Sequence, residues 1–247
     1  MEIRTFGVGR RLSVCESILA ERLYDRGGRL FLLPIPTSRD NRYITASHIT
    51  PDDLCREIYP TDYLVGYDLP PTLCDFADRE GIFYYDAARD EDFLLANAVL
   101  TARGTVGYIL TEFDRDIADM TFGIVGYGRI GSALLRLLLF FGAPTTVFTG
   151  RESLAIELCR SGISSRLVGE GCNAEGIDIL INTAPSRQLR KEDIPDETKI
   201  IDLASGNIFE PSDRLVRLPS VPERYYPVTA GKLYAEAILR GLWGERL

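Results

Sequence analysis

The stretch Thr121-Phe-Gly-Ile-Val-Gly126-Tyr-Gly128-Arg-Ile-Gly131 decides how this chain folds. An apolar strand runs directly into the pattern G-x-G-x-x-G, and a helix-like segment beginning at Ser132 follows. In such a unit Gly126 permits the tight turn, Gly128 leaves room for a diphosphate, and Gly131 lets the helix pack close to the sheet. The helix N-terminus offers free N–H groups and a positive dipole end. The stretch therefore predicts a dinucleotide-binding turn that includes Arg129 and Ile130.

The strand after this turn indicates which dinucleotide binds. A site for NAD usually carries Asp or Glu about 20 residues downstream, where the carboxylate binds the ribose 2′-hydroxyl. The next predicted strand, Thr145–Thr149, ends instead in Gly-Arg151-Glu152-Ser153. Arg151 and the hydroxyls of Thr149 and Ser153 suit a 2′-phosphate, because a guanidinium forks onto phosphate oxygens. The sequence favours NADP over NAD. The alternative is that Arg151 is a solvated helix-start residue and that Glu152 turns inward to the ribose.

Length and composition fit a soluble enzyme. The 247 residues suffice for one large or two small domains. A hydrophobic content of 45% with 26% charged residues is ordinary for a globular protein. The net charge of -8 and the pI near 4.9 argue against a nucleic-acid partner, because phosphate binding needs a dense basic face.

Cysteine usage and the N-terminus indicate the compartment. The five cysteines lie far apart without a CxxC motif, so we expect neither a disulfide framework nor a metal site. The N-terminus lacks the layout of a signal peptide, and no uninterrupted apolar run approaches the roughly 20 residues of a membrane span. We therefore expect a cytoplasmic protein that does not enter a membrane.

Hydrophobic periodicity predicts an α/β protein of two Rossmann-like, doubly wound parallel-sheet units bridged by a long helix. Residues 1–92 are predicted to form an N-terminal α/β domain, flavodoxin-like or Rossmann-like. Residues 93–229 are predicted to form the NAD(P)-binding domain, which opens with the bridging helix 93–112. Residues 230–247 are predicted to form a C-terminal helix that packs across the domains. The exposed length of the bridging helix makes a homodimer reasonable.

Loops beyond the carboxyl ends of strands line the ligand crevice of a doubly wound sheet. Two such loops follow the predicted strands 178–181 and 199–202, and they contain Asn182-Thr183-Ala-Pro185-Ser186-Arg187 and Leu203-Ala-Ser205. We expect Thr183 and Pro185 to line the cofactor and Asn182 to hold the nicotinamide amide. A further turn, Gly7-Val-Gly9, either holds an anion or serves close backbone packing.

The order of these motifs resembles the A-type polypeptide of dipicolinate synthase. The resemblance rests on Thr101-x-x-Gly104-Thr105, Val125–Gly131, Gly150-Arg151, Asp178–Thr183, Ile201–Ser205 and Thr229-Ala-Gly231. It implies a Rossmann-type, nicotinamide-dependent oxidoreductase acting on a cyclic dicarboxylate, 4-hydroxy-tetrahydrodipicolinate, and leading to dipicolinate. It also implies a partner, the flavoprotein-like B subunit, together with a role in the sporulation of spore-forming bacteria.

That chemistry requires a hydride acceptor, a group that moves a proton, and cations for two carboxylates. Lys232 is the first catalytic candidate, because a helix N-terminus just before it would lower its pKa. Ser205 and Asn182 are the others. For each of these residues a solvated or capping role is the alternative. The predicted substrate-binding residues are Arg103, Thr105, Ser186 and Arg187.

Two other functions share this architecture. D-2-hydroxyacid dehydrogenases use a histidine paired with an acid as their base, but the sole histidine here is His48, in the N-terminal half. That function is close to excluded. A non-catalytic, NADP-binding regulatory or scaffolding subunit of a two-subunit enzyme stays open, because no obvious acid/base pair stands out.

Overall fold

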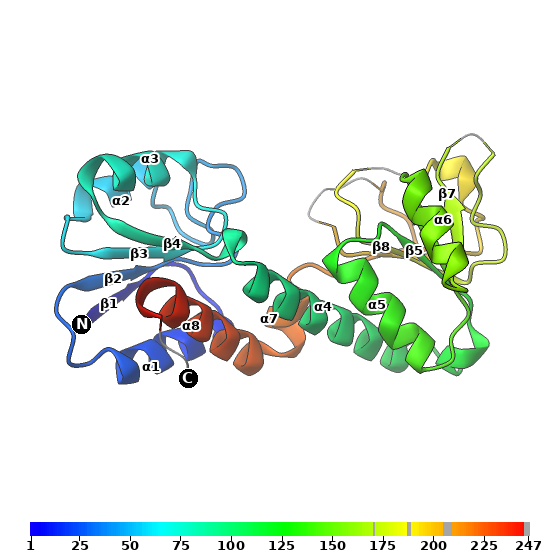
Figure 1. Cartoon of the computed structure of the whole chain (residues 1–247), viewed down its shortest axis with the longest axis horizontal. Helices are drawn as coiled ribbons and strands as arrows, with labels where there is room; N and C mark the ends of the chain where they lie inside the picture. Colours follow the sequence, from blue (N-terminus) through cyan, green and yellow to red (C-terminus); the bar gives the residue numbers. More distant parts are fainter. Residues whose placement is uncertain (170, 187–188, 205–208, 245–247) are drawn as a thin grey trace. The chain divides into compact units, whose positions relative to one another are not determined.

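The computed structural model describes residues 1–169, 171–186, 189–204 and 209–244, and the chain folds as two compact units (Figure 1). The first unit comprises Met1–Asn97 and Pro222–Leu247, and the second comprises Ala98–Val221. The sequence predicts boundaries at 92 and 229. The chain instead passes between the units inside its longest helix, α4 (Glu91–Glu112), and again just before Pro222.

Four parallel strands form the sheet of the first unit, in the order β1-β2-β3-β4. Because they follow one another in sequence order, this sheet differs from the second one, in which the order reverses. Helices cover both of its faces, with α1 and α8 on one side and α2 and α3 on the other (Figure 1). The bounds are β1 Glu2–Thr5, β2 Arg29–Leu32, β3 Tyr63–Gly66, β4 Phe83–Asp86, α1 Arg10–Arg22, α2 Pro51–Glu57, α3 Pro71–Glu80 and α8 Pro227–Trp243.

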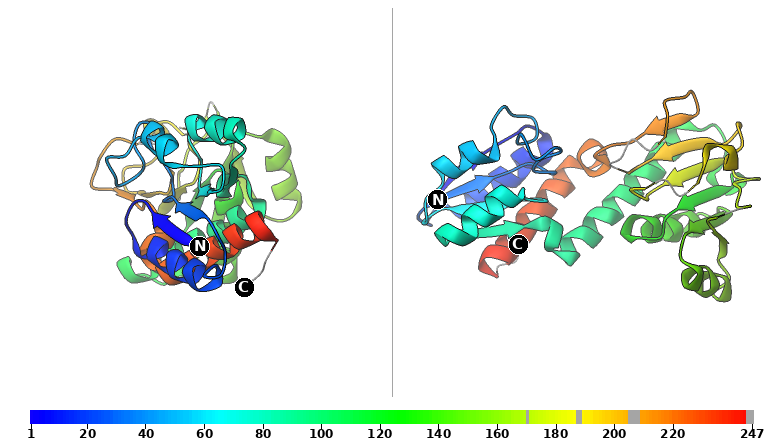
Figure 2. Two further views of the ribbon diagram at one scale, coloured as in Figure 1. Left: turned by 90° about the vertical axis from the view of Figure 1, so that its left-hand side faces the viewer. Right: turned by 90° about the horizontal axis from the view of Figure 1, so that it is seen from above.

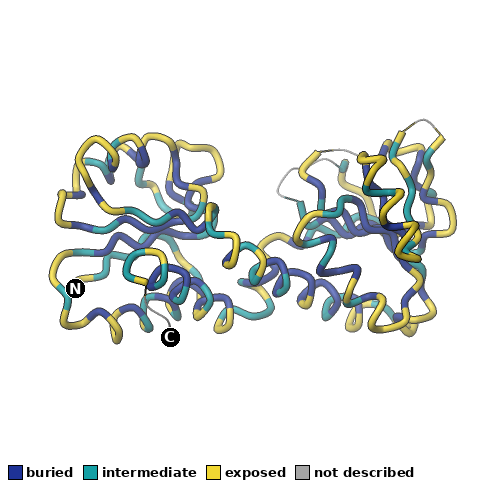
Figure 3. The backbone as a smooth tube through the Cα atoms, in the orientation of Figure 1, coloured by how far each residue is buried: buried dark blue, intermediate teal, exposed yellow. Residues whose placement is uncertain are grey.

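Side chains of β2 alternate between two apolar clusters, as expected for a strand covered on both faces. Leu30 and Leu32 pack with α1 and α8, in a cluster that includes the fully buried Tyr234. Phe31 points to the other face and packs with α2 and α3. Figure 3 shows buried chain along the two central strands of this sheet, β2 and β3, in which three of four residues each are buried.

The C-terminal helix α8 belongs to the first unit. It packs mainly on α1, and it also contacts β4 and the short 3-10 helix η1 (Ala87–Arg89). Near its C-terminal end, Arg240 donates to Asp90 Oδ2 at 2.6 Å, and the Tyr85 hydroxyl donates to the same oxygen at 2.6 Å. These contacts lie within the first unit, to which α8 belongs.

The second unit contains a six-stranded parallel sheet with the order β10-β9-β8-β5-β6-β7. The chain enters the sheet at β5, adds β6 and β7 on one side, and returns to add β8, β9 and β10 on the other. The order reverses between β5 and β8, which is where open α/β sheets bind ligands beyond the carboxyl ends of their strands. The bounds are β5 Phe122–Val125, β6 Thr145–Thr149, β7 Ser164–Leu167, β8 Ile179–Asn182, β9 Lys199–Asp202 and β10 Leu215–Arg217.

Helices and irregular segments cover this second sheet (Figure 2). Helices α5 and α6 follow β5 and β6, whereas Phe148 and Leu180 on one face pack against Leu189 and Ile194 from irregular chain. The two α/β units confirm the predicted fold class. The remaining elements are α5 Arg129–Phe140, α6 Glu152–Arg160, α7 Val221–Tyr225, η2 Ile117–Asp119 and η3 Lys191–Asp193.

Among the described helices, α4 has the length and composition that would fit a membrane span, with a mean hydropathy of 1.4 over its most apolar window. Half of that window is buried inside the protein, as in the core helix of a globular domain. Asp90 caps the helix, because its Oδ1 accepts the Phe93 N–H at 3.0 Å.

Candidate functional site

The glycine turn lies at the point where the strand order reverses. Gly126 follows β5 with φ of +90°, a conformation that glycine adopts without steric cost. Its N–H donates to the Phe148 carbonyl of β6 at 2.9 Å. The Thr183 hydroxyl, just after β8, donates to the carbonyls of Val125 at 3.0 Å and Gly126 at 3.3 Å. Both neighbouring strands therefore hold the turn in place.

The other two glycines have different surroundings. A Cβ at Gly131 would lie 2.3 Å from the Gly126 carbonyl oxygen, so a side chain there would force α5 away from the turn. A Cβ at Gly128 would meet no atom within 4 Å, and Gly128 is exposed. Open space therefore lies over Gly128, where the fingerprint places a diphosphate.

The N-terminus of α5 suits an anion. Gly128 is its cap residue and, having no side chain, makes no capping hydrogen bond to the first N–H groups of the helix. The nearby Ser132 hydroxyl donates to the Arg129 carbonyl at 3.1 Å instead. Unpaired N–H groups at the positive end of the helix dipole attract phosphate. Arg129 is exposed and Ile130 half-buried, so the predicted turn residues fit a dinucleotide diphosphate.

The end of β6 carries the residues predicted to select the dinucleotide. Thr149 is buried, and its hydroxyl accepts the Arg151 N–H at 3.1 Å, which fixes the backbone of this turn. Arg151 is the cap residue of α6, and Glu152 and Ser153 begin that helix; all three are exposed. Within the described residues, the Arg151 guanidinium has no hydrogen bond or ion pair. Its charge is therefore available to a ligand, whereas Thr149 acts through the backbone.

Asn182 is completely buried at the end of β8. Its Nδ2 donates to the Ala184 carbonyl at 3.1 Å and to Asp202 Oδ1 at 2.8 Å, and its Oδ1 accepts the Ala184 N–H at 3.3 Å. The amide that we expect to hold the nicotinamide thus holds the loop after β8 instead. Pro185 and Ser186 of that loop are exposed.

Asp202 is a residue of this site that the sequence does not single out. It is paired in register with Asn182 and is only 2% exposed. Its Oδ1 also accepts the Ala204 N–H at 3.2 Å, while Oδ2 is buried without a hydrogen bond in the described structure. Asp202 therefore fixes the first residues of both crevice loops. The signal in the sequence is one acid at the end of the otherwise apolar Ile200-Ile-Asp202.

The predicted substrate and catalytic residues differ in their exposure. Arg103 on α4 is exposed, but Thr105 is fully buried and its hydroxyl donates to the Thr101 carbonyl at 2.9 Å. Lys232 is exposed in the first unit. Because α8 begins at Pro227, Lys232 lies beyond the first turn of that helix and not at its N-terminus. The catalytic candidate Ser205 and the substrate-binding candidate Arg187 lie outside the described residues.

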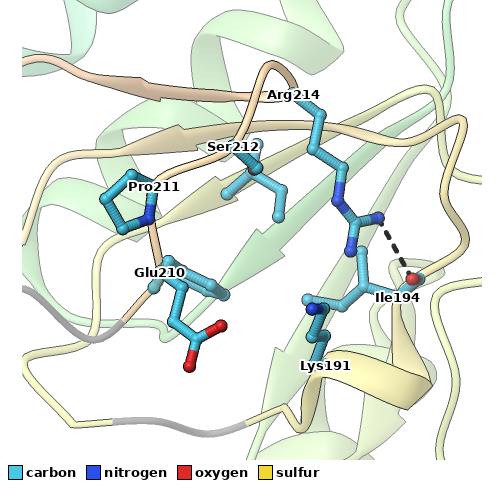
Figure 4. Close-up of a pocket in the computed structure, with 8 residues that line it drawn as sticks. Lys191, Ile194, Glu210, Pro211, Ser212 and Arg214 are labelled. Carbon is cyan, nitrogen blue, oxygen red and sulfur yellow. Dashed lines mark hydrogen bonds between the residues drawn. The ribbon is translucent and has the colours of Figure 1, made fainter.

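A separate cavity of about 90 Å³ lies beside η3 and the start of β10 (Figure 4). Lys191 and Glu210 line it together with apolar side chains, and Arg214 donates to the Ile194 carbonyl at 3.2 Å. This volume is far too small for a dinucleotide. Among the described residues, no group of three or more His, Cys, Asp or Glu side chains is placed to hold a metal ion.

Comparison with known proteins shows what the chain resembles. No family model matches it, and a search of curated proteins finds no match. The crystal structure of the A-type polypeptide of dipicolinate synthase from Bacillus halodurans superposes with a TM-score of 0.77 at 18% identity, over 98% of this chain and 97% of that one. The corresponding polypeptide of dipicolinate synthase from Bacillus subtilis gives 0.73 at 19% identity, over 96% and 94%.

Two further structures share the architecture. The transhydrogenase of Sinorhizobium meliloti has a TM-score of 0.57 at 14% identity, covering 94% of this chain and 86% of that one. An L-alanine dehydrogenase has 0.56 at 14% identity, covering 97% and 88%. The chain thus shares the α/β fold of these proteins, and its predicted resemblance to the A-type polypeptide of dipicolinate synthase is confirmed at the level of that fold.

Proposed function

We propose that the chain is an NAD(P)-dependent oxidoreductase, or the nicotinamide-binding subunit of one. The observation that carries the proposal is the open backbone at Gly128, directly before the uncapped N-terminus of α5 and at the switch point of the second sheet. A bound nicotinamide supplies the site for hydride transfer. The chain's own contribution is to bind the diphosphate and to orient the two ends of the cofactor.

The cofactor we propose is NADP. The exposed Arg151 guanidinium carries a charge that no described residue neutralises, and it stands at the first turn of α6, whose N–H groups also favour an anion. A 2′-phosphate would use both, whereas a 2′-hydroxyl would use neither well. NAD remains the alternative, with the exposed Glu152 as the ribose ligand.

The substrate class we propose is a small cyclic dicarboxylate such as 4-hydroxy-tetrahydrodipicolinate, which is the substrate implied by the resemblance of this chain to the A-type polypeptide of dipicolinate synthase. Its conversion to dipicolinate loses the hydroxyl as water, passes one hydride to NADP⁺ and releases one proton. Arg103 and Arg187 are the proposed carboxylate ligands, with Ser186 as a hydroxyl donor. Lys232 and Ser205 are proposed to move the proton, and Asn182 contributes by holding the crevice loop.

A second candidate function is an NADP-binding regulatory or scaffolding subunit. It is favoured by the chemistry of the second unit, which contains no histidine, and by the burial of Asp202. On either function we propose a cytoplasmic homodimer that works with a flavoprotein-like second subunit.

Turnover by the purified chain separates the two functions. The chain is incubated with NADP⁺ and freshly made 4-hydroxy-tetrahydrodipicolinate, and NADPH fluorescence and dipicolinate are followed. Formation of both products by this chain alone supports the enzyme. NADPH binding without turnover supports the non-catalytic subunit. If the chain binds neither NADP⁺ nor NADPH, both proposed functions are refuted.

A further inference from the structure

In the first unit, a carboxylate of the chain itself occupies the N-terminus of α1. Glu223, on α7, accepts the Arg11 backbone N–H at 3.3 Å on Oε1 and at 3.2 Å on Oε2. Arg11 Nε donates to Oε2 at 3.2 Å as well. The Gly7-Val-Gly9 turn predicted to hold an anion or to pack backbone thus leads into a bound carboxylate.

The backbone of this turn is shaped for that carboxylate. Gly9 has φ of +139°, and a Cβ there would lie 2.9 Å from Glu223 Oε1. Gly9 is also the cap residue of α1 and offers no side chain to its N–H groups. Any larger residue would displace the oxygen, so the turn admits an anion only because position 9 is glycine.

Arg11 supplies the charge. Its side chain is only 7% exposed, and burial lowers the pKa of the guanidinium while Glu223 opposes that change. Within the described residues, its two terminal nitrogens make no hydrogen bond. A buried guanidinium without an anion beside it costs free energy, so Arg11 must always be paired. Its hydrogen-bond donors are only partly used by the pairing with Glu223.

Glu223 is a poor permanent partner for such a site. Its side chain is 31% exposed, and it stands on a helix of five residues immediately after the chain returns from the second unit. Two hydroxyl oxygens in this region, those of Thr5 at the end of β1 and Thr45, are buried without a hydrogen bond in the described structure. The Thr45 carbonyl lies 3.1 Å from where a Cβ of Gly7 would stand, which places this loop against the turn.

We propose that the turn from Gly7 to Arg11 is a carboxylate-binding site, which Glu223 fills when no ligand is bound and from which a carboxylate of the substrate displaces it. The chemical class of the ligand rests on the proposed function. The site lies beyond the carboxyl end of β1, the first strand of that sheet. Glu223 then acts as an internal competitor that keeps Arg11 paired until substrate arrives.

Calorimetric titration of the full-length chain with pyridine-2,6-dicarboxylate tests the site. Glu223→Gln keeps the size of the side chain but removes the competing charge, so it should bind the probe about tenfold more tightly than wild type. Adding Arg11→Met to that variant should abolish the gain. Arg10→Met, at the exposed neighbouring position, is the matched control and should leave the gain intact.

Equal affinity of wild type and Glu223→Gln would overturn the inference, as would equal binding by the Arg11→Met and Arg10→Met variants. If circular dichroism shows that Glu223→Gln does not fold, Glu223→Asp replaces it, because the shorter side chain retreats from Arg11 and should give a smaller gain. NADPH titrations of the same proteins test the proposed function separately. Unchanged NADPH binding without the gain refutes this inference alone, whereas the gain without NADPH binding refutes the proposed cofactor alone.

Discussion

Replacing Gly128 with Ala separates cofactor binding from folding. The added Cβ meets no protein atom within 4 Å, and φ of -90° with ψ of -159° is open to alanine. The free energy of unfolding should therefore change by less than about 1 kcal/mol, with a gain expected because alanine restricts the unfolded chain. The methyl group would instead keep a diphosphate from the N–H groups of α5. Losing one charged hydrogen bond costs about 1.5–3 kcal/mol, so NADPH affinity should fall roughly 10- to 150-fold.

Gly131→Ala is the control for this prediction. Its Cβ would lie 2.3 Å from the Gly126 carbonyl oxygen, a backbone atom that cannot turn away. Forcing α5 outward should cost about 1–3 kcal/mol of stability as well as cofactor affinity. Urea denaturation and NADPH fluorescence titration measure both quantities. The reasoning is refuted if Gly128→Ala binds NADPH like wild type, or if it loses as much stability as Gly131→Ala.

Three further predictions concern the cofactor, the crevice and the pH dependence of stability. Arg151→Ala should weaken NADPH binding by about 1–3 kcal/mol and leave NADH nearly unchanged; equal losses in a fluorescence titration would contradict the NADP assignment. Asp202→Ala should cost about 1–3 kcal/mol of stability, since Asn182 loses a partner, whereas Asp202→Asn keeps an acceptor and should retain most of it in urea denaturation. Equal losses would show that Asp202 does not act through that bond. Arg29 donates to the buried Asp62 at 3.0 and 2.5 Å, so Arg29→Ala should cost about 3 kcal/mol at neutral pH. Burial raises the pKa of Asp62, but hydrogen bonds from Arg29 and the Tyr59 N–H outweigh it and hold the pKa below 3.8. This stabilisation is complete above the unfolded pKa and is lost as the pH falls through the folded one, so the two proteins should converge in acid; a constant difference would contradict the pairing.

Much of the fold could be predicted because local sequence patterns indicate many of its strands and helices. The buried strand Thr145–Thr149 has the bounds that its pattern predicts. The two edge strands β7 and β10 were not predictable. Ser164–Leu167 is polar and Leu215–Arg217 is three residues long, so neither has an apolar period, and both depend on pairing with a neighbour already in place.

The residues of the candidate sites likewise divide into those that a local motif indicates and those whose role depends on residues distant in the sequence. The roles of Gly126, Gly128 and Gly131 depend on neighbouring residues and could be predicted from the motif. The contact of Glu223 with Arg11 joins residues 212 positions apart, and no local pattern signals it. Asn182 is the opposite case. Its type and position suit a ligand contact, but its side-chain amide donates a hydrogen bond to the buried Asp202 of the next strand.

Hydrogen exchange of the backbone amides, with and without NADPH, tests the central claim most directly. If the glycine turn binds the diphosphate of NADPH, the backbone amides from Gly128 through Ser132 should exchange markedly more slowly when NADPH is present, because their N–H groups then donate to phosphate oxygens. Unchanged exchange in this segment at saturating NADPH, or protection confined to other parts of the chain, would contradict the account.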